Sequence, residues 1–548
     1  MTGGAGPRAS VPRPATRGIA VRLGITCWLV YSLHFATNMV RENYLALSIG
    51  DSLSFRVDPY ANLHDDIFEH PGFGWHIGSN PGASIIGAIP YALARPLIER
   101  MVDRVRRSRR AAGASGPPVY DAPTAKDRTF YEEAWRRGFD VKFGLASFVM
   151  QSFGMAVVSA LGVVVLYRLL LSLLASASGA LALALLYAFG TPVFYRTGFL
   201  NHNLMLAHAG LLGFAVLGDR WNWRGVTRER LFLLGGLAGG TALLLDYSGV
   251  LLLAGLWAYG LMRHRRGART RDMVRFTAAY ALGALVPVLL LWWYQWRSFG
   301  HPFLPPQNWM PPVEWSDHGY RGLDAPQPGL AMALAFDYRF GLFVSCPLFL
   351  LALMAPFVDR RAGLLPRLDL TFCLAIAAAF FLFFSSVQYT RWQFNTGVRY
   401  LAPVFPFLFL PAAAVLRRLP QWSGRLIALA SLTLAWSMAM ARDVSGGKVD
   451  LADPDAGFGV LDAVITVFTS GFRLPALSTL SRMQAYSSIT GGRVSALPLL
   501  LLAAAILWLV WSRPGESPIG TTSRETGGDR STTNPPTAEN APAGSALD

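Results

Sequence analysis

Residues 276–294 of this chain read FTAAYALGALVPVLLLWWY, and residues 494–511 read VSALPLLLLAAAILWLVW; neither stretch contains a charged residue. The hydrocarbon core of a bilayer is about 30 Å thick, so a helix needs about 20 mostly apolar residues to cross it. Both stretches meet this demand, and so do residues 341–357 and 426–441. The sequence therefore predicts an integral membrane protein that crosses the bilayer as α-helices.

The composition agrees with this prediction. Hydrophobic residues make up 53% of the 548 positions and charged residues only 15%, with a mean hydropathy of +0.35. A soluble protein carries about 25% charged residues. The net charge of +16 would favour nucleic-acid binding in a soluble protein, but here the basic residues form short clusters between apolar runs. We therefore expect the lipid bilayer, and no nucleic acid, as a partner.

The three cysteines of the chain do not indicate a set of disulfide bonds. Cys27, Cys346 and Cys373 lie inside or beside apolar runs and show no metal-ligand spacing. Disulfides and metal sites need paired cysteines, usually in loops. We predict that all three are small buried side chains. The first apolar run begins after Arg22 and lacks a small-residue cleavage site, which is typical of a signal anchor.

The topology follows from the positions of the basic residues, because short loops rich in arginine stay in the cytoplasm. These loops are 219–230, 263–275, 359–367 and 417–425. Placing them on the side of the basic N-terminal tail requires an even number of crossings between each pair. The result is about twelve transmembrane helices with both termini in the cytoplasm, in a bacterial inner (plasma) membrane. The predicted helices are 23–38, 145–170, 178–195, 203–218, 231–245, 248–262, 276–295, 340–357, 369–387, 401–416, 426–441 and 494–511.

One short apolar segment needs a separate interpretation. Ala83–Leu93 is too short to span and contains Pro90. A span here would invert every downstream loop, so we predict an interfacial or re-entrant helix over 83–97 inside an outer loop of residues 39–143. Further outer loops are expected at 296–338 and 442–493.

The chain then divides into four parts. A cytoplasmic basic tail covers residues 1–22, and a transmembrane core covers 23–416, including the first outer loop. C-terminal transmembrane helices occupy 417–512, with their own outer loop. Residues 513–548 are rich in Ser, Thr, Pro and Gly and predict a disordered cytoplasmic tail.

The first outer loop carries the densest group of acids and histidines, including Glu42, His64, Asp65 and Asp66. Carboxylates and imidazoles are the ligands of divalent metals, and a positioned carboxylate can also act as a general base. A plain solvated loop is the alternative interpretation.

Three other predicted outer segments carry cations or imidazole. Arg399 and Arg339 each stand at the entrance of a helix, where an arginine is costly unless it is paired or snorkels to the interface. A guanidinium there can hold two phosphate oxygens by a fork-like contact. His202 lies in a tight turn over 196–203. A helix bundle that gathers these segments would suit an amphiphile with its tail in lipid and its phosphate at the outer surface.

The order of these segments resembles a known family. Asp66 is followed by Ser79-Asn80-Pro81-Gly82-Ala83-Ser84 and Pro90-Tyr91. Later stretches that carry the resemblance are Phe189–Tyr195 with Asn201-His202, Gly239–Tyr247, Ser298–Phe303, Phe340–Phe343 with Pro347, and Gly397–Leu401. Together, over about residues 20–415, they resemble the GT-C superfamily of polyprenyl-phosphate-dependent glycosyltransferases, of the protein O-mannosyltransferase and aminoarabinose-transferase type.

This resemblance implies an all-α membrane helix bundle with long outer loops. It also implies a catalytic carboxylate in the first outer loop: Asp66 first, Asp65 second, with Glu42 as a rival. Arg399 resembles the arginine that contacts the lipid phosphate, and Arg339 and Tyr400 are expected beside it. A divalent metal, where one is present, would lie next to the acid, with Asp66, His64 and His202 as ligands.

Two positions depart from the family pattern. Arg41-Glu42 stands where relatives often have an acidic pair, and Ser79-Asn80 stands where they tend to have a lysine. The expected function is transfer of a sugar from a polyprenyl-phosphate donor to a glycan, lipid or protein acceptor at the outer face. A transporter or flippase of lipid-linked glycans, and a non-catalytic envelope-assembly protein, remain alternatives. So does a metal-dependent outer-face hydrolase or phosphotransferase.

Overall fold

The chain folds into a bundle of helices with little sheet, as seen in a computed structural model. The structure describes residues 13–36, 39–113, 116, 125–174, 176–221, 225–358, 363–394, 397–441, 448–450, 459–470 and 497–512. The predicted disordered tail 513–548, most of the outer loop 442–493 and the first twelve residues of the basic tail lie outside these residues.

The N-terminal half contains the helices α1 (Arg13–Leu33), α2 (Arg41–Ser52), α3 (Gly82–Ala111), α4 (Ala125–Arg136), α5 (Asp140–Met150), α6 (Ala156–Leu174), α7 (Ala177–Gly190), α8 (Val193–Arg196), α9 (His202–Leu217), α10 (Arg228–Leu245) and α11 (Gly249–His264). The C-terminal half contains α12 (Thr270–Phe299), α13 (Pro328–Phe336), α14 (Leu342–Ser345), α15 (Leu350–Val358), α16 (Arg367–Ser385), α17 (Phe405–Leu416), α18 (Gln421–Met440), α19 (Val460–Ser470) and α22 (Leu497–Ser512). Two antiparallel pairs of short strands complete the fold: β1 (Ile67–His70) with β2 (Gly74–Ile77), and β3 (Trp392–Phe394) with β4 (Lys448–Asp450).

The described helices include spans of membrane length. Asp140–Leu174, Thr270–Phe299, Arg367–Ser385 and Gln421–Met440 are long and apolar enough to cross a bilayer, and shorter apolar helices accompany them. Asp140–Leu174 is continuous because the π-helical turn η2 (Gln151–Met155) joins α5 to α6. The prediction of a helical, polytopic membrane protein is therefore confirmed, and most of the predicted spans fall on single helices.

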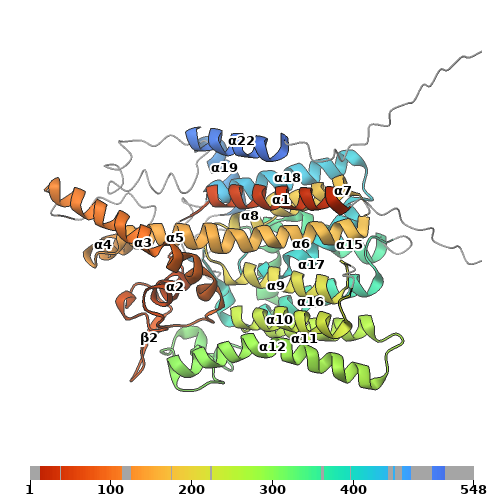
Figure 1. Ribbon diagram of the computed structural model, residues 1–548, viewed down its shortest axis with the longest axis horizontal. Coiled ribbons are helices and arrows are strands. Elements are labelled where there is room, and N and C mark those ends of the chain that lie inside the picture. The colour runs from red at the N-terminus through yellow and green to blue at the C-terminus, as the bar shows by residue number, and fades with distance from the viewer. Residues whose placement is uncertain are drawn as a thin grey trace, which may run out of the picture.

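The long helices run roughly parallel in Figure 1, and the segments that follow α1 gather at one end of the bundle, where α2, β2, α3 and α4 lie. The loops after α9 and after α11 lie at the opposite end. Glycines allow the closest approach within the bundle. A side chain at Gly236 of α10 would clash with the carbonyl oxygen of Tyr280, and one at Gly283 of α12 would clash with that of Leu233. These two helices therefore pack backbone against backbone.

Four predicted helices differ from the structure. The helix predicted over 178–195 is interrupted at Thr191-Pro192, between α7 and α8. Helix α1 covers Arg13–Leu33 rather than 23–38, because arginine is a good helix former and does not mark a helix start. The helix predicted over 83–97 continues to Ala111 despite Pro90 and Pro96, since the arginine-rich stretch after Pro96 contains no further proline or glycine. The helix predicted over 340–357 is interrupted at Cys346-Pro347, where the proline nitrogen has no hydrogen to donate.

Candidate active site

The first element of the site is the start of α2, which carries two neighbouring side chains of opposite charge, Arg41 and Glu42. Arg41 Nη1 donates to Asp66 Oδ2 at 2.7 Å, and Arg41 Nε lies 3.4 Å from Glu42 Oε1. Asp66 immediately precedes β1 and keeps 32% of its side chain exposed, whereas Glu42 keeps only 5%. One guanidinium thus joins a buried carboxylate to an accessible one.

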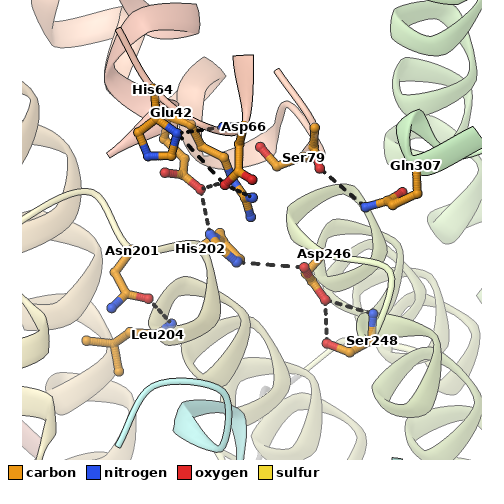
Figure 2. A network of polar contacts seen from close by, with 12 residues as sticks. Glu42, His64, Asp66, Ser79, Asn201, His202, Leu204, Asp246, Ser248 and Gln307 are labelled. Carbon is orange, nitrogen blue, oxygen red and sulfur yellow. Dashed lines mark hydrogen bonds and ion pairs between the residues drawn. The ribbon is translucent and has the colours of Figure 1, made fainter. Parts of the chain in front are cut away.

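The second element is His202, the first residue of α9. Asn201 caps this helix by accepting a hydrogen bond from the Leu204 backbone N–H. His202 Nδ1 lies 2.7 Å from Glu42 Oε1, and Nε2 lies 3.7 Å from Asp246 Oδ2. Figure 2 shows the imidazole between the two carboxylates. The ring therefore links the start of α2 to the turn between α10 and α11.

Asp246 is held in place by that turn. It follows the last residue of α10, and its Oδ1 accepts from the Ser248 N–H at 2.9 Å and from the Ser248 hydroxyl at 2.6 Å. This leaves Oδ2 directed at His202, as Figure 2 shows. The polar Asp246-Tyr247-Ser248 break in an apolar stretch thus supplies the third carboxylate of the network.

The charges of the network lower the pKa values of Glu42 and Asp66. Burial alone would raise the pKa of Glu42, but His202 and Arg41 outweigh it and lower that pKa. Burial would likewise raise the pKa of Asp66, but Arg41, then His64 and Arg399, lower it below its usual value. Burial lowers the pKa of His64. Asp66 is therefore a carboxylate, with an accessible oxygen, at neutral pH.

Arg399 reaches this network from the other half of the chain. Its guanidinium carbon lies 4.9 Å from the centre of the Tyr400 ring, a cation–π distance. The Tyr400 hydroxyl donates to the Trp392 carbonyl at 3.3 Å, and this hydrogen bond orients the ring that Arg399 contacts. Arg196, almost fully buried, holds the backbone just before Arg399: its Nε donates to the Val398 carbonyl at 2.7 Å and its Nη2 to that of Gly397.

Two residues proposed from the sequence lie apart from these contacts. Asp65 is exposed, while its neighbour Asp66 enters the network. Arg339 is buried and forms a fork with Asp337, from Nε to Oδ1 at 3.1 Å and from Nη2 to Oδ2 at 3.0 Å. The guanidinium paired with Asp66 is instead that of Arg41, and the positive charge of Arg399 also acts on this carboxylate.

The ligands suggested for a metal do not offer it a common set of donors. His64 Nδ1 accepts the Asp66 backbone N–H at 3.0 Å, and the Asp66 carboxylate is paired with Arg41. Both nitrogens of His202 face carboxylates. In the part of the chain that the structure describes, no three His, Cys, Asp or Glu side chains are arranged to hold a metal ion. We therefore derive no catalytic step through a metal.

Arg41, Asp246 and Arg196 are members of the site to which no role was assigned from the sequence. Arg41 stands next to Glu42 in the acid-rich segment after the first apolar run, Arg196 opens the turn 196–203, and Asp246 interrupts an apolar stretch. Their positions still indicated that each is paired, because a charged residue at the edge of an apolar run needs a partner. What the sequence could not supply was the identity of the partner, which in each case comes from a distant segment.

The fold and the site together define a polytopic helical membrane protein with an acid–imidazole–arginine network at one end of its bundle. No protein-family model and no curated protein matches the chain. Among solved structures, ArnT from Cupriavidus metallidurans bound to undecaprenyl phosphate is similar, with 14% sequence identity and a TM-score of 0.45, over 90% of this chain and 75% of that chain. A likeness this weak transfers no function, so the network itself must carry the functional argument.

Proposed function

We propose that this protein is a membrane glycosyltransferase that moves a sugar from a polyprenyl-phosphate donor to an acceptor at the extracytoplasmic face. The observation that carries the proposal is the network of Arg41, Glu42, Asp66, His202 and Asp246, with Arg399 beside it. Its members come from four separate segments and meet at one end of the bundle. The donor explains the membrane setting, because a long prenyl chain stays in the bilayer.

The cations of the network suit the phosphate of such a donor. Arg41 is paired with Asp66, and the positive charge of Arg399 also acts on this carboxylate. Arginine binds phosphate oxygens through its planar fork of N–H donors. In the reaction, the bond from the sugar C1 to the phosphate oxygen breaks, and the two arginines stabilise the charge that develops on the departing polyprenyl phosphate.

Asp66 is the carboxylate placed to accept a proton. It takes the proton of the acceptor hydroxyl while the acceptor oxygen forms a bond to C1, in a single displacement that inverts the anomeric carbon. Glu42 is too buried for this role. Paired with both Arg41 and His202, it positions the arginine, and Asp246 fixes the imidazole from the other side.

Donor binding would also strengthen the base. In the free protein the nearby guanidinium groups keep the pKa of Asp66 low, which makes it a weak proton acceptor. A phosphate that approaches Arg41 and Arg399 offsets their positive charge, so the pKa of Asp66 rises once the donor is bound. The acceptor is thereby activated only when the sugar is in place.

The test is turnover of a labelled polyprenyl-phosphate sugar by the full chain in vesicles, measured as release of polyprenyl phosphate. A flippase would leave the sugar–phosphate bond intact, so release separates the two functions. We expect Asp66→Asn to lower kcat by about 10²–10⁴-fold, since a positioned base contributes that much. We expect Arg399→Ala to weaken donor binding about tenfold or more.

Matched controls come from the same two loops. Glu69→Gln removes an exposed carboxylate from the same hairpin, and Arg391→Ala removes an exposed arginine from the segment before Arg399. Both should retain turnover. If Asp66→Asn and Arg399→Ala both turn over like the wild type, the roles assigned to these residues are wrong.

A further inference from the structure

Four buried polar atoms in two segments, residues 79–80 and 307–309, have no hydrogen-bond partner among the residues that the structure describes. They are Ser79 Oγ, Asn80 Oδ1, Gln307 Oε1 and Trp309 Nε1. Ser79 is 6% exposed and Asn80 only 2%. Buried polar groups in proteins are almost always paired, so each such atom requires an explanation. Four of them in two segments that touch each other indicate that something outside the protein completes their hydrogen bonds.

Hydrogen bonds connect these two segments to the segment that carries Asp66 and to the end of α10. The Gly78 N–H donates to the Asp66 carbonyl at 2.9 Å, which ties the segment before Ser79 to the proposed base. Gln307 Nε2 donates to the Gly78 carbonyl at 3.3 Å, and Asn80 Nδ2 donates to the Leu243 carbonyl at 2.7 Å, near the end of α10. Figure 2 shows Ser79 and Gln307 on the side of Asp66 that faces Asp246.

The hydrogen-bonding capacity of the unpaired atoms indicates which chemical groups could bind them. Both amide groups are oriented by their N–H donors, so the unpaired atoms of Asn80 and Gln307 are carbonyl oxygens that can only accept. Two acceptor oxygens disfavour a phosphate, which is itself an acceptor. They suit hydroxyl groups, and the Trp309 N–H and the Ser79 hydroxyl can donate in return. A polyol with several hydroxyls satisfies all four.

We infer that Ser79, Asn80, Gln307 and Trp309 form a hydroxyl-binding subsite that recognises the sugar to be transferred. This inference rests on the proposed function and deepens it, because it separates recognition of the sugar from recognition of the phosphate. Arg41 and Arg399 bind the phosphate of the donor, and the amide oxygens of Asn80 and Gln307 accept hydrogen bonds from the hydroxyl groups of its sugar. The subsite lies against the segment that carries the base.

Equilibrium binding to the purified full chain tests the inference without requiring an acceptor. The probes are farnesyl phosphate and the farnesyl-phosphate esters of glucose, mannose, galactose and arabinose. In the wild type, we expect at least one ester to bind more tightly than farnesyl phosphate. Each hydrogen bond contributes about threefold to tenfold. Asn80→Ala and Gln307→Ala should each reduce this gain while leaving the affinity for farnesyl phosphate unchanged.

Two variants are used because Asn80 is buried and its loss could disturb the fold. Gln307 is only partly buried, so Gln307→Ala should leave the fold intact. Asn308→Ala is the matched control; its side chain donates to the Pro305 carbonyl, and it should keep the full gain. If farnesyl phosphate binds but no ester binds more tightly, or if the gain survives in both variants, the subsite is wrong. If farnesyl phosphate does not bind at all, the proposed function fails and the subsite with it.

Discussion

At the scale of single residues, Arg41 changes how the acids of the first outer loop are understood. The sequence presents Asp66 and Glu42 as rivals for one role. The structure joins them through a single guanidinium and gives them different exposure. In the proposed reaction they therefore have separate roles: the accessible carboxylate accepts the proton, and the buried one orients the arginine and the imidazole.

The electrostatics of Asp66 predict a difference between two pH profiles. In the free protein its pKa lies below the usual carboxyl value, so the acid limb of kcat/KM should fall below the usual carboxyl range. Donor phosphate at Arg41 and Arg399 offsets the charges that lower this pKa, so the acid limb of kcat should lie at higher pH. Turnover measured between about pH 3 and pH 8 gives both limbs.

The Arg391→Ala variant is a suitable control for these profiles, because its side chain is exposed and binds Gln327. Its limbs should match those of the wild type. If the wild-type limbs of kcat and kcat/KM coincide, the donor does not alter the charge around Asp66, and the proposed coupling is wrong.

At the scale of elements, the approach of α10 to α12 depends on the absence of a side chain at Gly236. A methyl group there would meet the Tyr280 carbonyl oxygen of the neighbouring helix, and neither backbone can move without opening the interface. Gly236→Ala should therefore destabilise the protein by about 1–3 kcal/mol, the usual cost of overpacking. Thermal unfolding in detergent measures this change.

Gly329→Ala provides the comparison. A side chain at Gly329, near the start of α13, would meet no atom within 4 Å, and this variant should unfold like the wild type. Equal stability of the two variants would show that α10 and α12 can separate without loss.

The elements also show where sequence reasoning stops. Apolar runs predicted the spans because the bilayer imposes a length and a hydrophobicity on each helix. The same rule does not predict α2 or the second half of α3, because both lie outside the apolar runs. In the site, the sequence singled out the acids and arginines as candidates, but the pairing of His202 with Glu42 and Asp246 depends on how α2, α9 and α10 pack. No local pattern encodes that packing.

At the scale of the whole molecule, the proposal requires the site and the basic loops to lie on opposite sides of the membrane. Cysteine labelling tests this, because the native Cys27, Cys346 and Cys373 are all buried. A cysteine at the exposed Glu69 should react with a membrane-impermeant maleimide on intact cells. A cysteine at the exposed Arg266, in the loop between α11 and α12, should react only after permeabilisation.

The reverse pattern would place the network in the cytosol, where an outer-face transfer cannot occur. Reaction of both cysteines on intact cells would mean that the loops do not alternate as the basic residues predict.

The bond between Arg196 and the Val398 carbonyl joins positions 202 residues apart. Ribosomes deliver a polypeptide from its N-terminus, so α8 enters the membrane long before residue 398 has been translated. Until then the Arg196 guanidinium lacks the carbonyl groups that bind it in the mature protein, and an unsatisfied cation near lipid is costly. A nascent chain that stalls before this point would leave the buried guanidinium without these carbonyl partners, so the burial of Arg196 depends on synthesis of the chain to residue 398.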